Sequence, residues 1–136
     1  MKKKPFLSDP DIDLSGKTAL VRIDCDEDLR KQGEELIVDE DFRLKSAIPT
    51  LEELKEKGVK KIILCGHLGR PDGKPVSELS LEPISNWFTQ NYKLCPLVAL
   101  DNIDQDDSSL VLLENLRFHP GERQADEEFT KKLASL

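Results

Sequence analysis

The sequence predicts an α/β fold: a doubly wound, mostly parallel sheet with helices on both faces. Two observations support this prediction. First, the chain contains short, continuous runs of branched apolar residues, which are typical of strands buried on both sides. Second, these runs alternate with segments whose apolar residues recur at helical spacing. The 136 residues correspond to one domain, which is long enough to bury a sizeable core.

The first half of the chain predicts a strand, a loop or hairpin, a second strand and a helix, in that order. Residues 18–24 form a branched apolar run of strand length, residues 25–35 are polar and contain a glycine, and residues 36–38 form a shorter apolar run. We expect the helix to end at Gly58 and to be kinked or broken at Pro49. It begins at Asp41, and its apolar positions are Leu44, Ala47, Ile48, Leu51 and Leu54.

The second half continues the alternation of strands and helices. Ser80 is a candidate N-cap, with Pro83 tolerated in the first turn, and Asp126 is a candidate N-cap for the last helix. The expected elements are a strand at 59–65, a glycine- and proline-rich loop at 66–75, a helix at 80–92, strands at 96–100 and 110–113, and a helix after 126.

Helical spacing continues to the end of the sequence. Phe129, Lys132, Leu133 and Leu136 follow that spacing, and no glycine or proline ends the helix. Because helices alternate with strands in a doubly wound fold, we expect the chain to be cut at a helix end, with another strand to follow.

Composition excludes several functions. The chain has 27 acidic and 20 basic residues, a formal charge of −7, which disfavours nucleic acids and anionic membranes as partners. No apolar run approaches the ~20 residues that span a bilayer, and the basic residues 1–5 are not followed by the apolar core of a secretory signal. The sequence contains none of the glycine-rich patterns of nucleotide-binding loops and no Gly-x-Ser-x-Gly elbow.

The cysteines indicate a reducing compartment. Cys25, Cys65 and Cys95 are far apart, and no Cys-x-x-Cys pair occurs that would bind zinc or act as a redox couple. We interpret them as buried, reduced thiols of a cytosolic protein, and we expect no metal site in these residues.

The residues that follow the predicted strands indicate a binding site, because open parallel sheets bind ligands beyond the carboxyl ends of their strands. Asp24 and Asp26 follow the first strand, and the segments 66–71 and 114–121 follow two others, each with an arginine and a histidine. Arg43, at the start of the first helix, adds a third guanidinium. Arginine suits carboxylate or phosphate ligands, so the sequence predicts a site for a small anion.

Simpler explanations exist for each of these residues. A loop arginine is often a solvated charge, and a loop histidine is often a partly exposed polar residue. Asp24 and Asp26 can cap backbone donors in a turn, and Arg22, within the first strand, can pair with an acidic neighbour.

Four blocks of sequence resemble phosphoglycerate kinase: residues 21–26, 41–50, 66–73 and 112–119, which read VRIDCD, DFRLKSAIPT, GHLGRPDG and LLENLRFH. The resemblance implies two doubly wound lobes joined by a hinge, of which this chain matches only the first part of the N-terminal lobe, residues 1–136. That lobe binds 3-phosphoglycerate. The nucleotide-binding C-terminal lobe, and a later segment with another substrate arginine, are absent from the sequence.

The resemblance also implies a role for each matching residue. Arg43 corresponds to the catalytic arginine, which stabilises the phosphoryl group during transfer and contacts the substrate. Arg70 and Arg117 would bind the substrate phosphate. The implied substrate-binding residues are Asp24, Cys25 (through its backbone), Asp26, Arg43, His67, Leu68, Gly69, Arg70 and Arg117.

The implied activity is reversible phosphoryl transfer between 1,3-bisphosphoglycerate and ADP, giving 3-phosphoglycerate and ATP in glycolysis. Magnesium and the nucleotide would be bound by the missing lobe, so the 136 residues are expected to be inactive alone. The enzyme would be a cytoplasmic monomer acting on small molecules. The alternative is a non-catalytic module of the same fold, either one that binds phosphate or carboxylate groups or a regulatory one.

One block departs from the family pattern. Where the family has Asp-Phe-Asn-Val-Pro, residues 24–28 read Asp-Cys-Asp-Glu-Asp. Asp26 therefore replaces a neutral amide, and like charges at ~4 Å repel by about 4 kcal/mol at an effective dielectric near 20. This substitution favours weaker substrate binding and supports the non-catalytic alternative.

Overall fold

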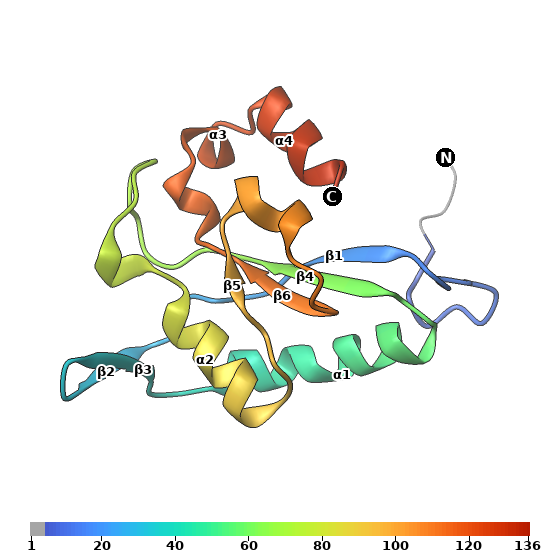
Figure 1. Cartoon of the computed structure of the whole chain (residues 1–136), viewed down its shortest axis with the longest axis horizontal. Coiled ribbons are helices and arrows are strands. Elements are labelled where there is room, and N and C mark those ends of the chain that lie inside the picture. The colour runs from blue at the N-terminus through green and yellow to red at the C-terminus, as the bar shows by residue number, and fades with distance from the viewer. Residues whose placement is uncertain (1–4) are drawn as a thin grey trace.

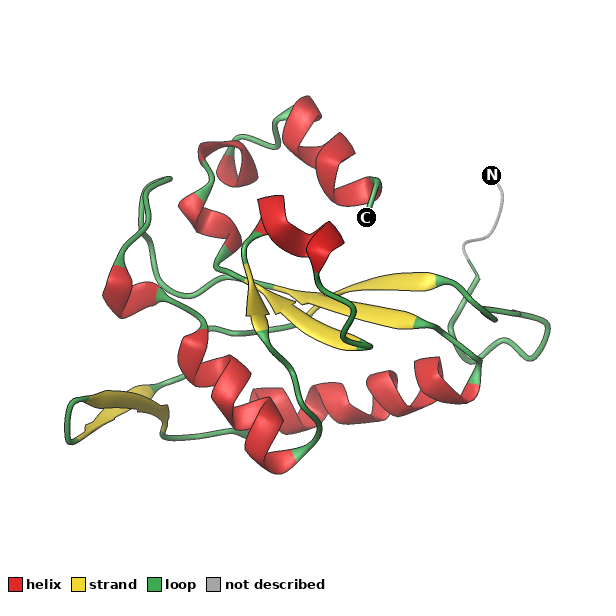
Figure 2. Cartoon of the chain, viewed as in Figure 1, coloured by secondary structure: helices red, strands yellow, loops and turns green. Residues whose placement is uncertain are grey.

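The computed structural model describes residues 5–136 and contains one parallel sheet, as predicted. The spatial order is β1-β4-β6-β5, and every neighbouring pair is parallel. The strands are β1 (Thr18–Arg22), β4 (Lys61–Cys65), β5 (Leu97–Val98) and β6 (Leu110–Leu113). Figure 1 shows helices on both faces of this sheet, and Figure 2 separates helices from strands by colour. The predicted α/β fold class is confirmed.

The two central strands carry the core on both of their faces. Ile62 and Leu64 of β4 belong to one buried cluster, whereas Ile63 and Cys65 belong to a second cluster on the opposite face. Alternation of side chains along a strand explains this division. It also explains why these strands read as continuous apolar runs in the sequence.

On the first face, α1 (Phe42–Glu56) and α2 (Glu82–Asn91) cover the sheet. Helix α1 runs through Pro49 without a break, so of the two predicted outcomes, a kink or a break, the break does not occur. Gly58 follows the helix with a φ of 83°, in the left-handed region that favours glycine, as expected of a residue that ends a helix. The core residues of α1 are Leu44, Leu51 and Leu54.

On the second face, α4 (Glu127–Ala134) packs over the sheet through Phe129 and Leu133. Asp126 caps this helix, since its carboxylate accepts a hydrogen bond from the backbone N–H of Phe129 at 2.9 Å, as predicted. The shorter elements near this face are the 3-10 helices η2 (Leu100–Gln105) and η3 (Leu116–Phe118) and the helix α3 (Pro120–Arg123).

A hairpin extends away from the sheet. It consists of β2 (Leu29–Gln32) and β3 (Glu35–Val38), and β3 lies beside α2 (Figure 1). The sequence predicted a loop or hairpin here, and it missed a 3-10 helix, η1 (Ser77–Leu79), before α2. Ser80 does not occupy the N-cap position, which is taken by Leu81, although the Ser80 hydroxyl accepts a hydrogen bond from the N–H of Glu82 at 3.2 Å.

The cysteines are buried and unbridged, as the sequence predicted. Within residues 5–136, no helix has the length and apolar character needed to cross a membrane.

Candidate functional site

The candidate site is a hollow at the carboxyl ends of β1 and β4. Its volume is about 410 Å³. It lies where the sheet rule places ligands in parallel α/β proteins. The lining residues are Arg22, Ile23, Asp24, Asp26, Arg43 and His67.

Arg43 is held at the hollow by the segment that follows β1. Its Nε lies 3.5 Å from the Oδ2 of Asp24, and its Nη1 donates a hydrogen bond to the backbone carbonyl of Asp26. About half of each charged side chain of the Arg43–Asp24 pair stays exposed. The guanidinium is therefore oriented at the hollow and still open to solvent.

Asp24 also has the local role that the simpler explanation gave it. Its Oδ1 accepts a hydrogen bond from the backbone N–H of Asp26 at 3.0 Å, which stabilises the turn after β1. The same carboxylate thus shapes the turn through one oxygen and faces Arg43 through the other.

Asp26 joins two strand-end loops. Its Oδ1 accepts a hydrogen bond from the backbone N–H of Gly69 at 3.1 Å. Gly69 has a φ of 62°, and a Cβ at this position would lie 2.8 Å from a methyl carbon of Leu79. The positive φ therefore favours glycine at this position, and a larger residue would also have to displace the Leu79 side chain. One carboxylate oxygen of Asp26 is consequently engaged with the protein backbone.

Asn115 holds the same loops through hydrogen bonds in the protein interior. It is fully buried and donates hydrogen bonds to the carbonyls of Leu68 and Leu79, both at 2.9 Å. Its Oδ1 accepts a hydrogen bond from the backbone N–H of Arg117 at 3.0 Å. Sequence reasoning did not assign a role to Asn115. The available signal was a polar amide directly after a fully apolar strand, where buried polar groups must be hydrogen-bonded.

Arg117 lies beside the hollow without lining it. Its Nη1 donates a hydrogen bond to the carbonyl of Gly69 at 3.2 Å, and its Nε lies 3.4 Å from Oε2 of Glu122. Oε1 of Glu122 lies 3.3 Å from Nη2 of Arg22, which does line the hollow. The pairing of Arg22 with an acidic residue is confirmed, whereas its place in the hollow was missed.

His67 lines the hollow and is partly buried. Burial, and next the positive charge of Arg117, lower the pKa of His67 from its ordinary value. The side chain is therefore neutral at neutral pH. Its Nδ1 is buried and has no hydrogen-bond partner among the described residues.

The remaining predicted residues lie around the hollow. Cys25 is fully buried, which raises the pKa of its thiol, and its carbonyl accepts a hydrogen bond from the backbone N–H of Glu27 at 2.8 Å. Leu68 is also buried. Arg70 is exposed, does not line the hollow, and has no hydrogen-bond or ion-pair partner in residues 5–136. His119 lies apart from the hollow, with its ring 5.3 Å from that of Phe129.

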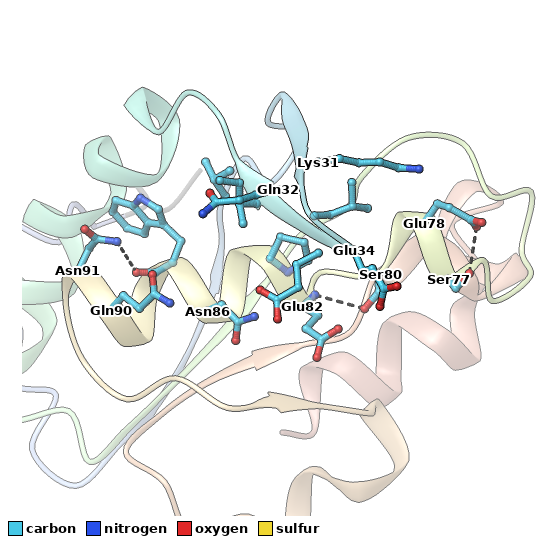
Figure 3. A pocket seen from close by; sticks show the side chains of 16 residues that line it. Lys31, Gln32, Glu34, Ser77, Glu78, Ser80, Glu82, Asn86, Gln90 and Asn91 are labelled. Atoms are coloured by element: carbon cyan, nitrogen blue, oxygen red, sulfur yellow. Dashed lines mark hydrogen bonds between the residues drawn. The ribbon is translucent and has the colours of Figure 1, made fainter.

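A larger cavity, of about 790 Å³, lies between the hairpin and α2 (Figure 3). Its charged lining is mainly acidic, with Lys31 as a basic member, so it does not suit an anion. The acidic members are Glu34, Glu35, Glu78 and Glu82. In the described part of the chain, no group of three or more His, Cys, Asp or Glu side chains is placed to hold a metal ion.

A parallel α/β sheet with helices on both faces is typical of doubly wound proteins, and the arginine, histidine and aspartate side chains at its strand-end edge form a candidate site for a small charged ligand. The model of the family described as phosphoglycerate kinase matches residues 10–136. The chain belongs to the phosphoglycerate kinase family.

Individual relatives agree with this assignment. The chain is 38% identical to the phosphoglycerate kinase of Picosynechococcus over 144 residues, covering 99% of the chain and 35% of the relative. It is 40% identical to that of Legionella pneumophila strain Corby, covering 93% and 32%. The solved phosphoglycerate kinase of Coxiella burnetii has a TM-score of 0.80 at 30% identity, covering 97% of this chain and 33% of that one. The chain thus spans about a third of the length of its relatives.

Proposed function

We propose that the chain forms the first part of the N-terminal, 3-phosphoglycerate-binding lobe of a phosphoglycerate kinase. The activity would be reversible phosphoryl transfer between 1,3-bisphosphoglycerate and ADP, giving 3-phosphoglycerate and ATP. The observation that carries this proposal is Arg43, held by Asp24 and the Asp26 carbonyl at a strand-end hollow in a chain of this family.

Arg43 would act on the group being transferred. Phosphoryl transfer needs little covalent chemistry from the protein, so positioned positive charge supplies much of the catalysis. The contacts of Arg43 use its Nε and Nη1 and leave Nη2 for a phosphoryl oxygen. Its planar fork suits such a group better than the point charge of a lysine.

The other residues would bind 3-phosphoglycerate. Arg70, exposed and unpaired within residues 5–136, and Arg117, fixed on the Gly69 carbonyl, would contact the phosphate. Asp24, Asp26 and His67 line the hollow and would orient the rest of the molecule. Cys25, Leu68 and Gly69 would contribute backbone atoms.

Nucleotide and magnesium would bind to the part of a phosphoglycerate kinase that corresponds to the other two thirds of its relatives. On the family's pattern we infer a cytoplasmic monomer that acts on small molecules.

The proposal is tested by calorimetric titration of the chain with 3-phosphoglycerate. We expect Arg43→Ala to weaken binding about tenfold, because it removes a charge-assisted hydrogen bond to the ligand. Arg30→Ala is the matched control, since Arg30 is an exposed arginine of the hairpin that pairs with Asp39 at 2.8 Å. Equal affinities for the Arg43 variant and the unaltered chain would remove Arg43 from the site.

A non-catalytic module is the second candidate, and the acidic residues 26–28 favour it. The two are separated by a chimera in which this chain replaces the matching third of the Coxiella burnetii phosphoglycerate kinase. We expect the chimera to turn over in a coupled assay and to lose activity with Arg43→Ala. A folded chimera that binds 3-phosphoglycerate without turnover would support the non-catalytic module.

A further inference from the structure

Glu122 stands between two arginines that come from different strand ends. Arg22 ends β1, Arg117 lies in η3 after β6, and Glu122 lies in α3. One oxygen of the Glu122 carboxylate is 3.3 Å from Nη2 of Arg22, and the other is 3.4 Å from Nε of Arg117. The carboxylate therefore bridges two cations at the edge of the candidate site.

The bridge is more buried than the groups it joins. The Glu122 side chain is 10% exposed, against 25% for Arg117 and 57% for Arg22. The Nε of Arg117 and the Oε2 of Glu122 are buried and have no hydrogen-bond partner in the described residues, so their 3.4 Å contact is an ion pair without hydrogen-bond geometry. Burial strengthens this attraction relative to an exposed pair.

The contacts also fix which part of Arg117 remains available. Its Nη1 donates to the carbonyl of Gly69, and its Nε faces Glu122. Nη2 is left free for a ligand. On the other side, Arg22 lines the hollow that also contains Arg43 and His67.

The negative charge of Glu122 is expected to keep the Arg22 and Arg117 side chains close together. Two guanidinium groups at one edge repel each other, and a buried anion between them offsets that repulsion. Without the Glu122 charge, Arg22, already more than half exposed, is free to turn toward solvent. Arg117 then retains only its single hydrogen bond to Gly69.

We propose that Glu122 is a positioning residue for anion binding: it holds Arg22 and Arg117 together so that both guanidinium groups serve one anionic ligand. The inference rests on the proposed function in that it takes 3-phosphoglycerate as the ligand. It adds a residue of α3, and Arg22, to the set that determines affinity.

The experiment compares Glu122→Gln with the unaltered chain and with Glu34→Gln. Glu34 is exposed in the hairpin turn, far from α3 (Figure 1), and its substitution makes the same change in net charge. We expect Glu122→Gln to weaken 3-phosphoglycerate binding about fivefold, which corresponds to the upper end for exposed ion pairs, and we expect no effect of Glu34→Gln. Thermal unfolding of each variant is the control that tests whether the fold is retained.

A double-mutant cycle distinguishes positioning from a general structural effect. In an Arg22→Ala background, Glu122→Gln no longer disturbs the Arg22 contact and acts only through Arg117, so we expect its effect on affinity to shrink. The Nε–Hε NMR signal of Arg117 provides a readout that needs no ligand, and we expect it to shift in Glu122→Gln and not in Glu34→Gln.

The outcomes separate the two claims. Unchanged or tighter binding by Glu122→Gln, in a chain that binds 3-phosphoglycerate, overturns the positioning role and leaves the proposed function standing. If the unaltered chain does not bind 3-phosphoglycerate, the proposed function fails on its own. In that case the Arg117 NMR signal still tests the positioning role of Glu122. An unshifted signal in Glu122→Gln would show that Glu122 does not position Arg117.

Discussion

The loops at the strand ends contain two regions that are held in different ways. Asn115, beneath the loops, is fully buried and makes three hydrogen bonds to backbone atoms. Arg43 and Asp24, at the surface of the hollow, are about half exposed and lie 3.5 Å apart. Exposed ion pairs contribute about 0–1 kcal/mol, whereas a buried group left unpaired costs about 1–3 kcal/mol.

The difference separates folding from binding. The buried region sets where the loops lie, so its substitution is expected to cost stability. The surface region adds little to stability, and its charges remain available to a ligand. The predictions below test this separation, together with those already made for Arg43 and Glu122.

The largest effect is expected from the buried region. Asn115→Ala removes the partners of the Leu68 and Leu79 carbonyls and of the Arg117 N–H. We expect the free energy of unfolding to fall by about 3 kcal/mol, because buried polar groups are left unsatisfied. Denaturant unfolding followed by circular dichroism measures the change.

Asn102→Ala is the control for this prediction, since Asn102 is an exposed asparagine of η2. We expect it to change the unfolding free energy by less than about 0.5 kcal/mol. A similar small change for Asn115→Ala would contradict the view that the buried region holds the loops.

Asp26 is an exposed residue of the hollow that also contacts one of the strand-end loops, and we expect its substitution to have an intermediate effect. It lines the hollow, and its Oδ1 accepts the Gly69 N–H. Asp26→Asn keeps an acceptor oxygen and removes a negative charge from the site. We expect 3-phosphoglycerate to bind about tenfold more tightly, which corresponds to relief of about 1.4 kcal/mol of repulsion, with stability nearly unchanged. Calorimetric titration measures the affinity.

Asp28→Asn is the matched control, because Asp28 is exposed, lies two residues further on, and does not line the hollow. An equal gain in affinity from Asp28→Asn would show that the effect comes from net charge and not from the position of Asp26.

The parts of the fold that follow from local pattern were predictable from sequence. Continuous apolar runs identified β4 and β6, because both faces of these strands are buried. Asp126 was found because an N-cap acts within three residues of its partner. The strand-end rule placed Asp24, Asp26 and His67 at one edge, where they line the hollow.

Contacts between distant residues were not predictable. Arg22 and Glu122 are 100 positions apart, and no local pattern pairs them. The hydrogen bond from Asn115 to the carbonyl of Leu68 likewise joins residues that are 47 positions apart. The continuation of α1 through Pro49 also depends on tertiary packing, since local rules alone favour a break.

The smallest effect is expected from Glu27, a buried acidic side chain in the segment that follows β1. It is 7% exposed, and its Oε1 accepts a hydrogen bond from the backbone N–H of Leu44 at 3.2 Å. Burial raises the pKa of the Glu27 carboxyl from its ordinary value of 4.5. The folded state therefore holds this proton more tightly than the unfolded state. Its contribution to stability is complete below pH 4.5 and is lost as pH rises through the raised pKa.

Glu27→Gln keeps the acceptor for Leu44 and removes the titration, so its stability relative to the unaltered chain should increase with pH. We expect a gain of less than about 1 kcal/mol near neutral pH, as is usual for one exchange that retains its hydrogen bond, and no gain near pH 4. Denaturant unfolding at both pH values measures it, with Glu40→Gln, an exposed glutamate, as control. Lower stability of Glu27→Gln at neutral pH would mean that the charge is needed there. Burial alone would then not distinguish the groups that stabilise the fold from those that remain available to a ligand.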